Sequence, residues 1–152
     1  MAMNKIPQED IENFSVTMNL QAHRTVERSR DPLIPSREAR RATWVNTAGL
    51  YCSLDENTSQ CETKDFLNQP VTYLIISENP LSIFDVETYC QAKGVLESTF
   101  YAGMTSGTLG IHQLHGMKIH GAMWPSQKNR EGKSLVLYTE NIPGFPKGFT
   151  AQ

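Results

Sequence analysis

The sequence lacks a long hydrophobic run. Its longest apolar stretch, VTYLII at residues 71–76, is far shorter than the roughly 20 residues that a membrane-spanning helix needs. The start of the chain, MAMNKIPQEDIENF, has no apolar core of the kind that secretory signal peptides carry. We therefore expect a cytoplasmic protein that makes no contact with a membrane.

Cysteine is scarce, and complete catalytic motifs are missing. The three cysteines, Cys52, Cys61 and Cys90, are an odd number, and without a secretory signal they are expected to be free thiols. Cys52 falls on the apolar face of a predicted strand and Cys90 in the apolar part of a predicted helix, so both are expected in the core. The chain has no Cys-x-x-Cys pair, no G-x-S-x-G motif and no Walker-type phosphate loop. We expect no cofactor.

The chain has almost no net charge, but its arginines are clustered. The formal net charge of −2 gives the whole molecule no general attraction for nucleic acid. Residues 24–41, however, carry six arginines against three acids, a local charge of +3. Arginine forks suit phosphates and carboxylates, and a tryptophan that follows closely adds a ring for stacking. The candidate binding residues here are Arg24, Arg28, Arg30, Arg37, Arg40, Arg41 and Trp44.

The length of 152 residues predicts a single domain over residues 1–152. Residues 7–29 are predicted to form an N-terminal helix. Pro7 suits a first helical position, acids follow it, and apolar side chains recur at steps of three and four from Ile11 to Val26.

The remaining pattern alternates strands with one further helix. Strands are expected at 42–54, 71–76, 95–102 and 134–139, with a turn at Asn79–Pro80 and a helix that starts at Ser82 and stops before Gly94. Residues 71–102 could form one βαβ crossover. The predicted fold class is α+β, with a mixed or mainly antiparallel sheet of about five to six strands on which the N-terminal helix and the central helix pack.

Residues 140–152, ENIPGFPKGFTAQ, are expected to be irregular because two prolines and two glycines interrupt them. Phe145 and Phe149 nevertheless place two large rings in this segment. Chain ends fray unless they are tied down, so these rings are expected to pack on a partner or as a strap over the chain's own core.

Three of the four histidines, His112, His115 and His120, lie within nine positions. If residues 109–122 form one strand, His112 and His120 share a face and His115 points away. If His115 and Gly116 form a tight hairpin turn, His112 and His120 fall on opposite sides. Neither geometry brings all three together, so a metal site of these histidines needs ligands from other strands.

Three functional hypotheses follow. The first is a non-catalytic interaction or assembly protein, such as a subunit of a larger particle, for example a viral one, that contacts a protein partner or its own copies. Its contacts are the terminal segments and the arginine surface. The second is a small hydrolase, metal-dependent or not, built around His112 and His120 with a carboxylate such as Asp55 or Glu97. The third is a regulator with weak affinity for nucleic acid.

Overall fold

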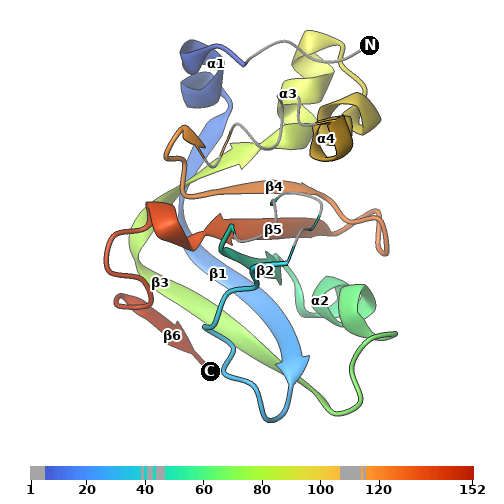
Figure 1. The fold of residues 1–152 in the computed structure, drawn as a ribbon, viewed down its shortest axis with the longest axis vertical. Coiled ribbons are helices and arrows are strands. Elements are labelled where there is room, and N and C mark those ends of the chain that lie inside the picture. Colours follow the sequence, from blue (N-terminus) through green and yellow to red (C-terminus); the bar gives the residue numbers. More distant parts are fainter. Residues whose placement is uncertain (1–5, 39, 41–42, 44–46, 107–113, 115) are drawn as a thin grey trace.

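The computed structural model describes residues 6–38, 40, 43, 47–106, 114 and 116–152. The elements, labelled in Figure 1, are α1 (Gln8–Asn13), β1 (Ser15–Glu27), β2 (Gly49–Ser53), α2 (Glu56–Thr63), β3 (Pro70–Asp85), α3 (Val86–Lys93), α4 (Glu97–Ser106), β4 (Gly121–Pro125), β5 (Lys133–Tyr138), a 3-10 turn (Thr139–Asn141) and β6 (Phe149–Ala151). In the ranges described, no helix is both long and apolar enough to cross a membrane.

The strands form one six-stranded mixed sheet in the order β1-β2-β5-β4-β3-β6. A further pairing between β1 and β3 closes five of them into a barrel, and β6 stays outside it on the free part of β3. All pairings are antiparallel except β3 with β4. The predicted α+β class with a mixed sheet of about six strands is confirmed.

The predicted N-terminal helix over 7–29 is wrong. The helix ends at Asn13, and residues 15–27 form β1, which pairs with β3 along nearly its whole length. Leu20, Ala22, Arg24 and Val26 are buried at every second position, as a strand requires. Because a charged residue, Arg24, occupies one of these inward positions, the alternation is hidden in the sequence.

The expected turn at Asn79–Pro80 is also absent, because β3 runs straight through it. Opposite this point β1 has a register shift between Asn19 and Gln21. The amide of Leu20, at the shift, donates to the Ser77 hydroxyl at 2.9 Å, and that hydroxyl donates to the carbonyl of Asn79 at 2.9 Å. These side-chain bonds replace ladder bonds that an irregular, proline-containing stretch cannot make.

Helix α3 begins later than predicted and ends where predicted. Its N-cap is Asp85, whose carboxylate accepts from the Thr88 amide at 3.2 Å, rather than Ser82. Gly94 ends it with a φ of +66°, a conformation that favours glycine.

Residues 95–102, predicted as a strand, belong mostly to helix α4. The ring of Phe100 is fully buried against Phe84 and Tyr89, and this packing outweighs the strand preference of the segment. Helices α3 and α4 form the connection that the parallel pair β3 and β4 needs, so the crossover predicted over 71–102 is present but longer. In Figure 1 they gather with α1 at one end of the barrel.

The two faces of β5 contribute to two hydrophobic clusters. Leu135 and Leu137 join side chains of all the other barrel strands, whereas Val136 and Tyr138 pack under α1, α3 and α4.

The C-terminal segment is not wholly irregular as predicted: β6 pairs with β3, and the rings of Phe145 and Phe149, 4.9 Å apart, pack on the barrel cluster. Within the chain these two rings act as a strap.

The expected burial of two free thiols is confirmed and has a pH-dependent consequence. Burial raises the pKa of Cys52 from its ordinary 9.0 to about 12, against the opposing effect of the Arg24 charge. Burial, with a contribution from Glu97, raises the pKa of Cys90 to about 12 as well. In the unfolded chain both thiols ionise near pH 9, so the native state holds protons that the unfolded state releases.

We therefore expect the free energy of unfolding to fall as pH rises from about 9 towards 12. Urea titrations at pH 8, 9 and 10 measure it, and a Cys52→Ala/Cys90→Ala variant should lose less stability over this range. Iodoacetamide at pH 8 should label Cys61, which is only half-buried, and spare the other two until the protein is denatured. Rapid native labelling of Cys52 or Cys90 would contradict the packing described above.

Candidate functional site

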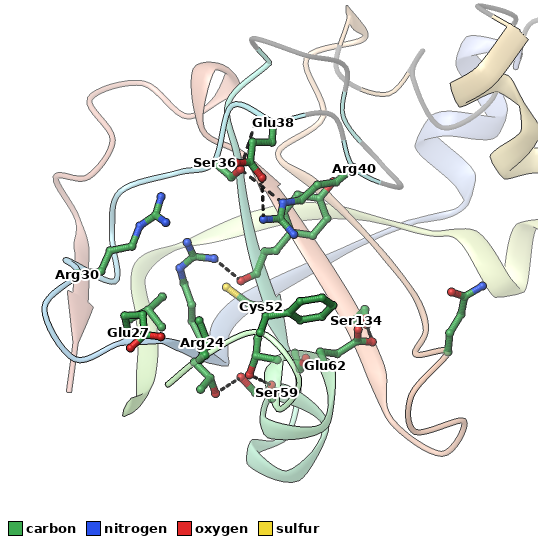
Figure 2. Close-up of a pocket in the computed structure, with 18 of the residues that line it drawn as sticks. Arg24, Glu27, Arg30, Ser36, Glu38, Arg40, Cys52, Ser59, Glu62 and Ser134 are labelled. Atoms are coloured by element: carbon green, nitrogen blue, oxygen red, sulfur yellow. Dashed lines mark hydrogen bonds and ion pairs between the residues drawn. The ribbon is translucent and has the colours of Figure 1, made fainter. Parts of the chain in front are cut away.

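A cavity of about 530 Å³ lies between α2, the segment that follows β1, and the strands β1, β2, β4 and β5. Figure 2 shows its polar side chains converging from these elements. The lining residues used below are Arg24, Glu27, Arg30, Ser36, Glu38, Arg40, Tyr51, Cys52, Ser59, Glu62, Phe66, Trp124 and Ser134. Charged, hydroxyl and aromatic groups thus share one concave surface, the usual make-up of a small-molecule site.

Arg24 is the most unusual residue of the cavity, because the residue is only 8% exposed and its guanidinium has no carboxylate partner among the described residues. Nη1 donates to the Tyr51 carbonyl at 2.7 Å and Nη2 to the Ile34 carbonyl at 3.3 Å. Nε is buried and lacks a hydrogen-bond partner in this part of the chain. A buried cation that is matched only by neutral carbonyls is energetically costly, so the arrangement favours an anionic ligand.

The sheet itself creates the space for this side chain. In the described part of the chain β1 meets β2 at one pair, His23 with Ser53, and the strands separate beyond it. The Arg24 guanidinium reaches into the gap and supplies the Tyr51 carbonyl with the donor that a paired strand would otherwise provide.

Two further arginines add positive charge to the cavity. Arg30 and Arg40 are exposed at their side chains, line the cavity, and act with burial to lower the pKa of Arg24, while Cys52 opposes this. Arg40 is 3.3 Å from Glu38, its Nε donates to Ser36 at 3.4 Å, and its guanidinium lies over the Tyr51 ring at 5.7 Å. The cavity lining as a whole has three arginines and three glutamates, Glu27, Glu38 and Glu62, so its formal charges balance while only Arg40 and Glu38 form an ion pair among the described residues that line it.

A smaller hollow of about 330 Å³ adjoins the cavity. Arg30, Ser36, Glu38 and Arg40 line both spaces, and Arg37 completes the hollow. With three arginines and one acid, the hollow has an excess of positive charge.

Glu62, near the end of α2, is one of three glutamates that line the cavity, and two serine hydroxyls bind it. Its Oε1 accepts hydrogen bonds from the hydroxyls of Ser126 and Ser134, the latter at 2.9 Å. The Ser126 oxygen already accepts from the amides of Lys128 and Asn129, so its proton is directed to Glu62. Oε2 has no hydrogen-bond partner in the described ranges and is available to a ligand.

Helix α2 is fixed to the turn that carries Ser126. Asp55 caps the helix by accepting from the Thr58 amide at 2.8 Å and the Thr58 hydroxyl at 2.7 Å, and these bonds hold the Asp55 pKa below its ordinary value. Asn129 donates to the same hydroxyl at 3.0 Å. A Cβ on Gly132 would lie 1.8 Å from the Thr58 oxygen, so glycine is required for this close approach.

The structure brings together part of the predicted arginine surface. Arg24, Arg30 and Arg40 line the cavity and Arg37 the adjoining hollow, while Arg28 is exposed and lines neither. Arg41 and Trp44 lie outside the described residues.

Of the three clustered histidines, the structure describes His120. His112 and His115 lie outside the described residues, and residues 114 and 116–120 are not in a strand, which leaves no support there for either predicted geometry. His120 precedes β4, whereas Asp55 caps α2 and Glu97 is in the first turn of α4. In the ranges described, no three His, Cys, Asp or Glu side chains are placed to hold a metal.

Several cavity residues were missed by the sequence analysis. Glu62 and Ser134 line the cavity, and Ser126 binds Glu62 from outside the lining. The three form no local motif, because 64 and 72 positions separate the glutamate from its two serines. Tyr51 lies in a predicted strand without any feature that distinguishes it. The one usable sign was Arg24, a charge at an inward position of an otherwise alternating segment.

His120 has a structural role in the described geometry. Its Nδ1 accepts from the Ser82 amide at 3.0 Å, its own amide donates to the Ser82 carbonyl at 3.1 Å, and its carbonyl accepts from Tyr138 at 2.8 Å. It therefore links β3 to the end of β5 immediately before β4 begins.

We expect His120→Ala to lower the free energy of unfolding by about 1–3 kcal/mol, because the Ser82 amide loses its acceptor. Urea unfolding measures this loss. His23→Ala is the control, since the His23 ring makes no hydrogen bond in the described structure, and it should cost less. Unchanged stability of His120→Ala together with a lost activity would restore the catalytic hypothesis for this histidine.

No family model and no curated protein sequence matches the chain. Among solved structures, the chain is similar to a chain in the crystal structure of the M. tuberculosis MbcT–MbcA toxin–antitoxin complex. The TM-score is 0.68 at 13% sequence identity, and the match covers 95% of this chain and 87% of that chain. The likeness establishes a shared fold over nearly the whole length of both chains.

Proposed function

We propose that the cavity binds a phosphate-bearing small molecule and that Glu62 acts on it chemically. The observation that carries the proposal is Arg24, a buried guanidinium without a carboxylate partner in the described structure. Planar guanidinium groups bind phosphate oxygens in a bidentate manner. Arg30 and Arg40 line the same cavity and, with Arg37, leave the adjoining hollow with three arginines against one acid, which favours the approach of an anion.

The cavity also suits the uncharged parts of such a ligand. A volume of about 530 Å³ is in the range of small-molecule sites. Hydroxyls of Thr25, Ser59 and Ser134 and the rings of Tyr51 and Trp124 face or border the same space. A molecule that combines phosphate, hydroxyl groups and a ring, as a nucleotide does, matches this lining.

Glu62 is the group best placed for chemistry. Two serine hydroxyls hold Oε1 and leave Oε2 for the ligand. A carboxylate fixed in this way is able to accept a proton from a bound hydroxyl or water, or to stabilise positive charge that develops on the ligand. This assignment replaces the histidines with a carboxylate as the centre of the enzyme hypothesis.

The binding part of the proposal is tested with ADP as the probe. We expect ADP to bind the wild-type protein and Arg24→Lys to bind it about tenfold or more weakly, since lysine keeps the charge but loses the bidentate fork. Isothermal titration calorimetry measures both affinities. Arg28→Lys is the matched control and should bind as the wild type does, because Arg28 lines neither cavity nor hollow. Equal affinities for the two folded variants would refute the assignment of Arg24.

A protein partner is a second proposal, and it retains the leading hypothesis from the sequence. It is supported by the fold likeness to a chain from a toxin–antitoxin complex. On this view the protein is toxin-type: its cavity acts on a cellular small molecule and a partner controls it. Weak binding of nucleic acid stays an untested prediction.

Inducible expression in a bacterial host tests the toxin-type proposal. The wild-type chain should arrest growth, and Glu62→Gln or Arg24→Lys should relieve the arrest at equal protein levels. Arg28→Lys should arrest growth as the wild type does. Normal growth with soluble wild-type protein would argue against a toxin, and an arrest that persists in Glu62→Gln would separate toxicity from the cavity.

A further inference from the structure

Phe66 is a large apolar side chain left open to solvent beside the cavity. It lies between α2 and β3, its side chain is 74% exposed, and it lines the cavity. Leu96 has a similar exposure of 72% but belongs to the connection between α3 and α4 and lines no part of the cavity. Single exposed apolar residues are common, so exposure by itself does not indicate a binding residue. Phe66 differs from Leu96 because it lines the cavity.

The segment that carries Phe66 is held to β1 by hydrogen bonds. The Glu27 carboxylate accepts from the amides of Asn68 and Gln69, the latter at 3.0 Å. The amide of Arg28 donates to the Gln69 carbonyl at 2.9 Å, and the amide of Phe66 donates to the Thr63 carbonyl at 3.0 Å. The ring is therefore presented from a backbone that is anchored on both sides.

Among the aromatic residues that line the cavity, Phe66 is the one without an aromatic neighbour in the described structure. The Tyr51 ring already packs against Trp124, with centroids 6.3 Å apart, and carries the Arg40 guanidinium on its face. Trp124 is buried and also contacts the Tyr101 ring. Phe66 makes no ring contact of this kind, so its face is available to a bound molecule.

We propose that Phe66 determines specificity by packing against the planar apolar part of the ligand whose phosphate is bound by Arg24. This inference rests on the proposed function of the cavity. Leu67, which follows Phe66 in the chain, and Val26 in β1 also contribute apolar side chains to the lining. The site thus separates into a polar interior that recognises charge and an apolar border that selects ligands with a ring. Stacking of a base on an aromatic side chain contributes enough affinity for this selection.

The test compares two probes, ADP and inorganic pyrophosphate, in titrations of the full chain. Phe66→Ala should bind ADP about tenfold more weakly than the wild type and bind pyrophosphate with unchanged affinity. Leu96→Ala removes an equally exposed apolar side chain and should change neither affinity. Phe66→Trp should keep the affinity for ADP, and its added fluorescence should change on addition of ADP and not of pyrophosphate.

The outcomes separate this inference from the function on which it rests. If ADP and pyrophosphate bind but Phe66→Ala affects neither, Phe66 is not a ligand contact and the phosphate site stands. If Phe66→Ala weakens both probes equally, the residue supports the segment rather than selecting a ring, and the inference fails. If pyrophosphate binds and ADP does not, the inference fails alone. If the wild type binds neither probe, both proposals fail.

Discussion

The burial of one positive charge between β1 and β2 organises the site. The Arg24 guanidinium bonds to the carbonyls of Tyr51 and Ile34, and so joins β1 to β2 and to the segment between them where the ladder has opened. Each of these bonds satisfies a carbonyl that would otherwise lack a partner. The same guanidinium has no carboxylate partner in the described structure, and this is the feature on which the proposed binding of an anion rests.

Glu62 balances this arrangement from the opposite side. Asp55 caps helix α2 at Thr58, and Asn129 donates a hydrogen bond to the Thr58 hydroxyl. Ser126, in the same turn as Asn129, donates to Glu62 and so orients the glutamate. Charges of opposite sign are thereby kept apart across a cavity instead of neutralising each other. Arg24 is bonded to carbonyls and Glu62 to hydroxyls, so each charge is compensated by neutral groups rather than by an opposite charge.

The elements that were predictable from sequence are those with local rules. Helix α3 has its stop at Gly94, and β5 has a continuous apolar run, so both were found. Helix α4 and β1 were misassigned because tertiary packing of Phe100 and the inward Arg24 decided their conformations. The sequence shows that the arginines are clustered, but it does not show which of them line one cavity. The path of the chain around the barrel decides that. Glu62 had no local signal at all.

The cavity joins the first strand to the last part of the barrel. Arg24 lies in β1 and Ser134 in β5, so more than two thirds of the chain separates two groups that border one space. The barrel closes only when β5 pairs with both β2 and β4, so the cavity is complete only with β5 in place. Long-range closure of this kind also slows folding. A chain cut before β5 would therefore keep Arg24 and Glu62 but lack Ser134, which lines the same cavity.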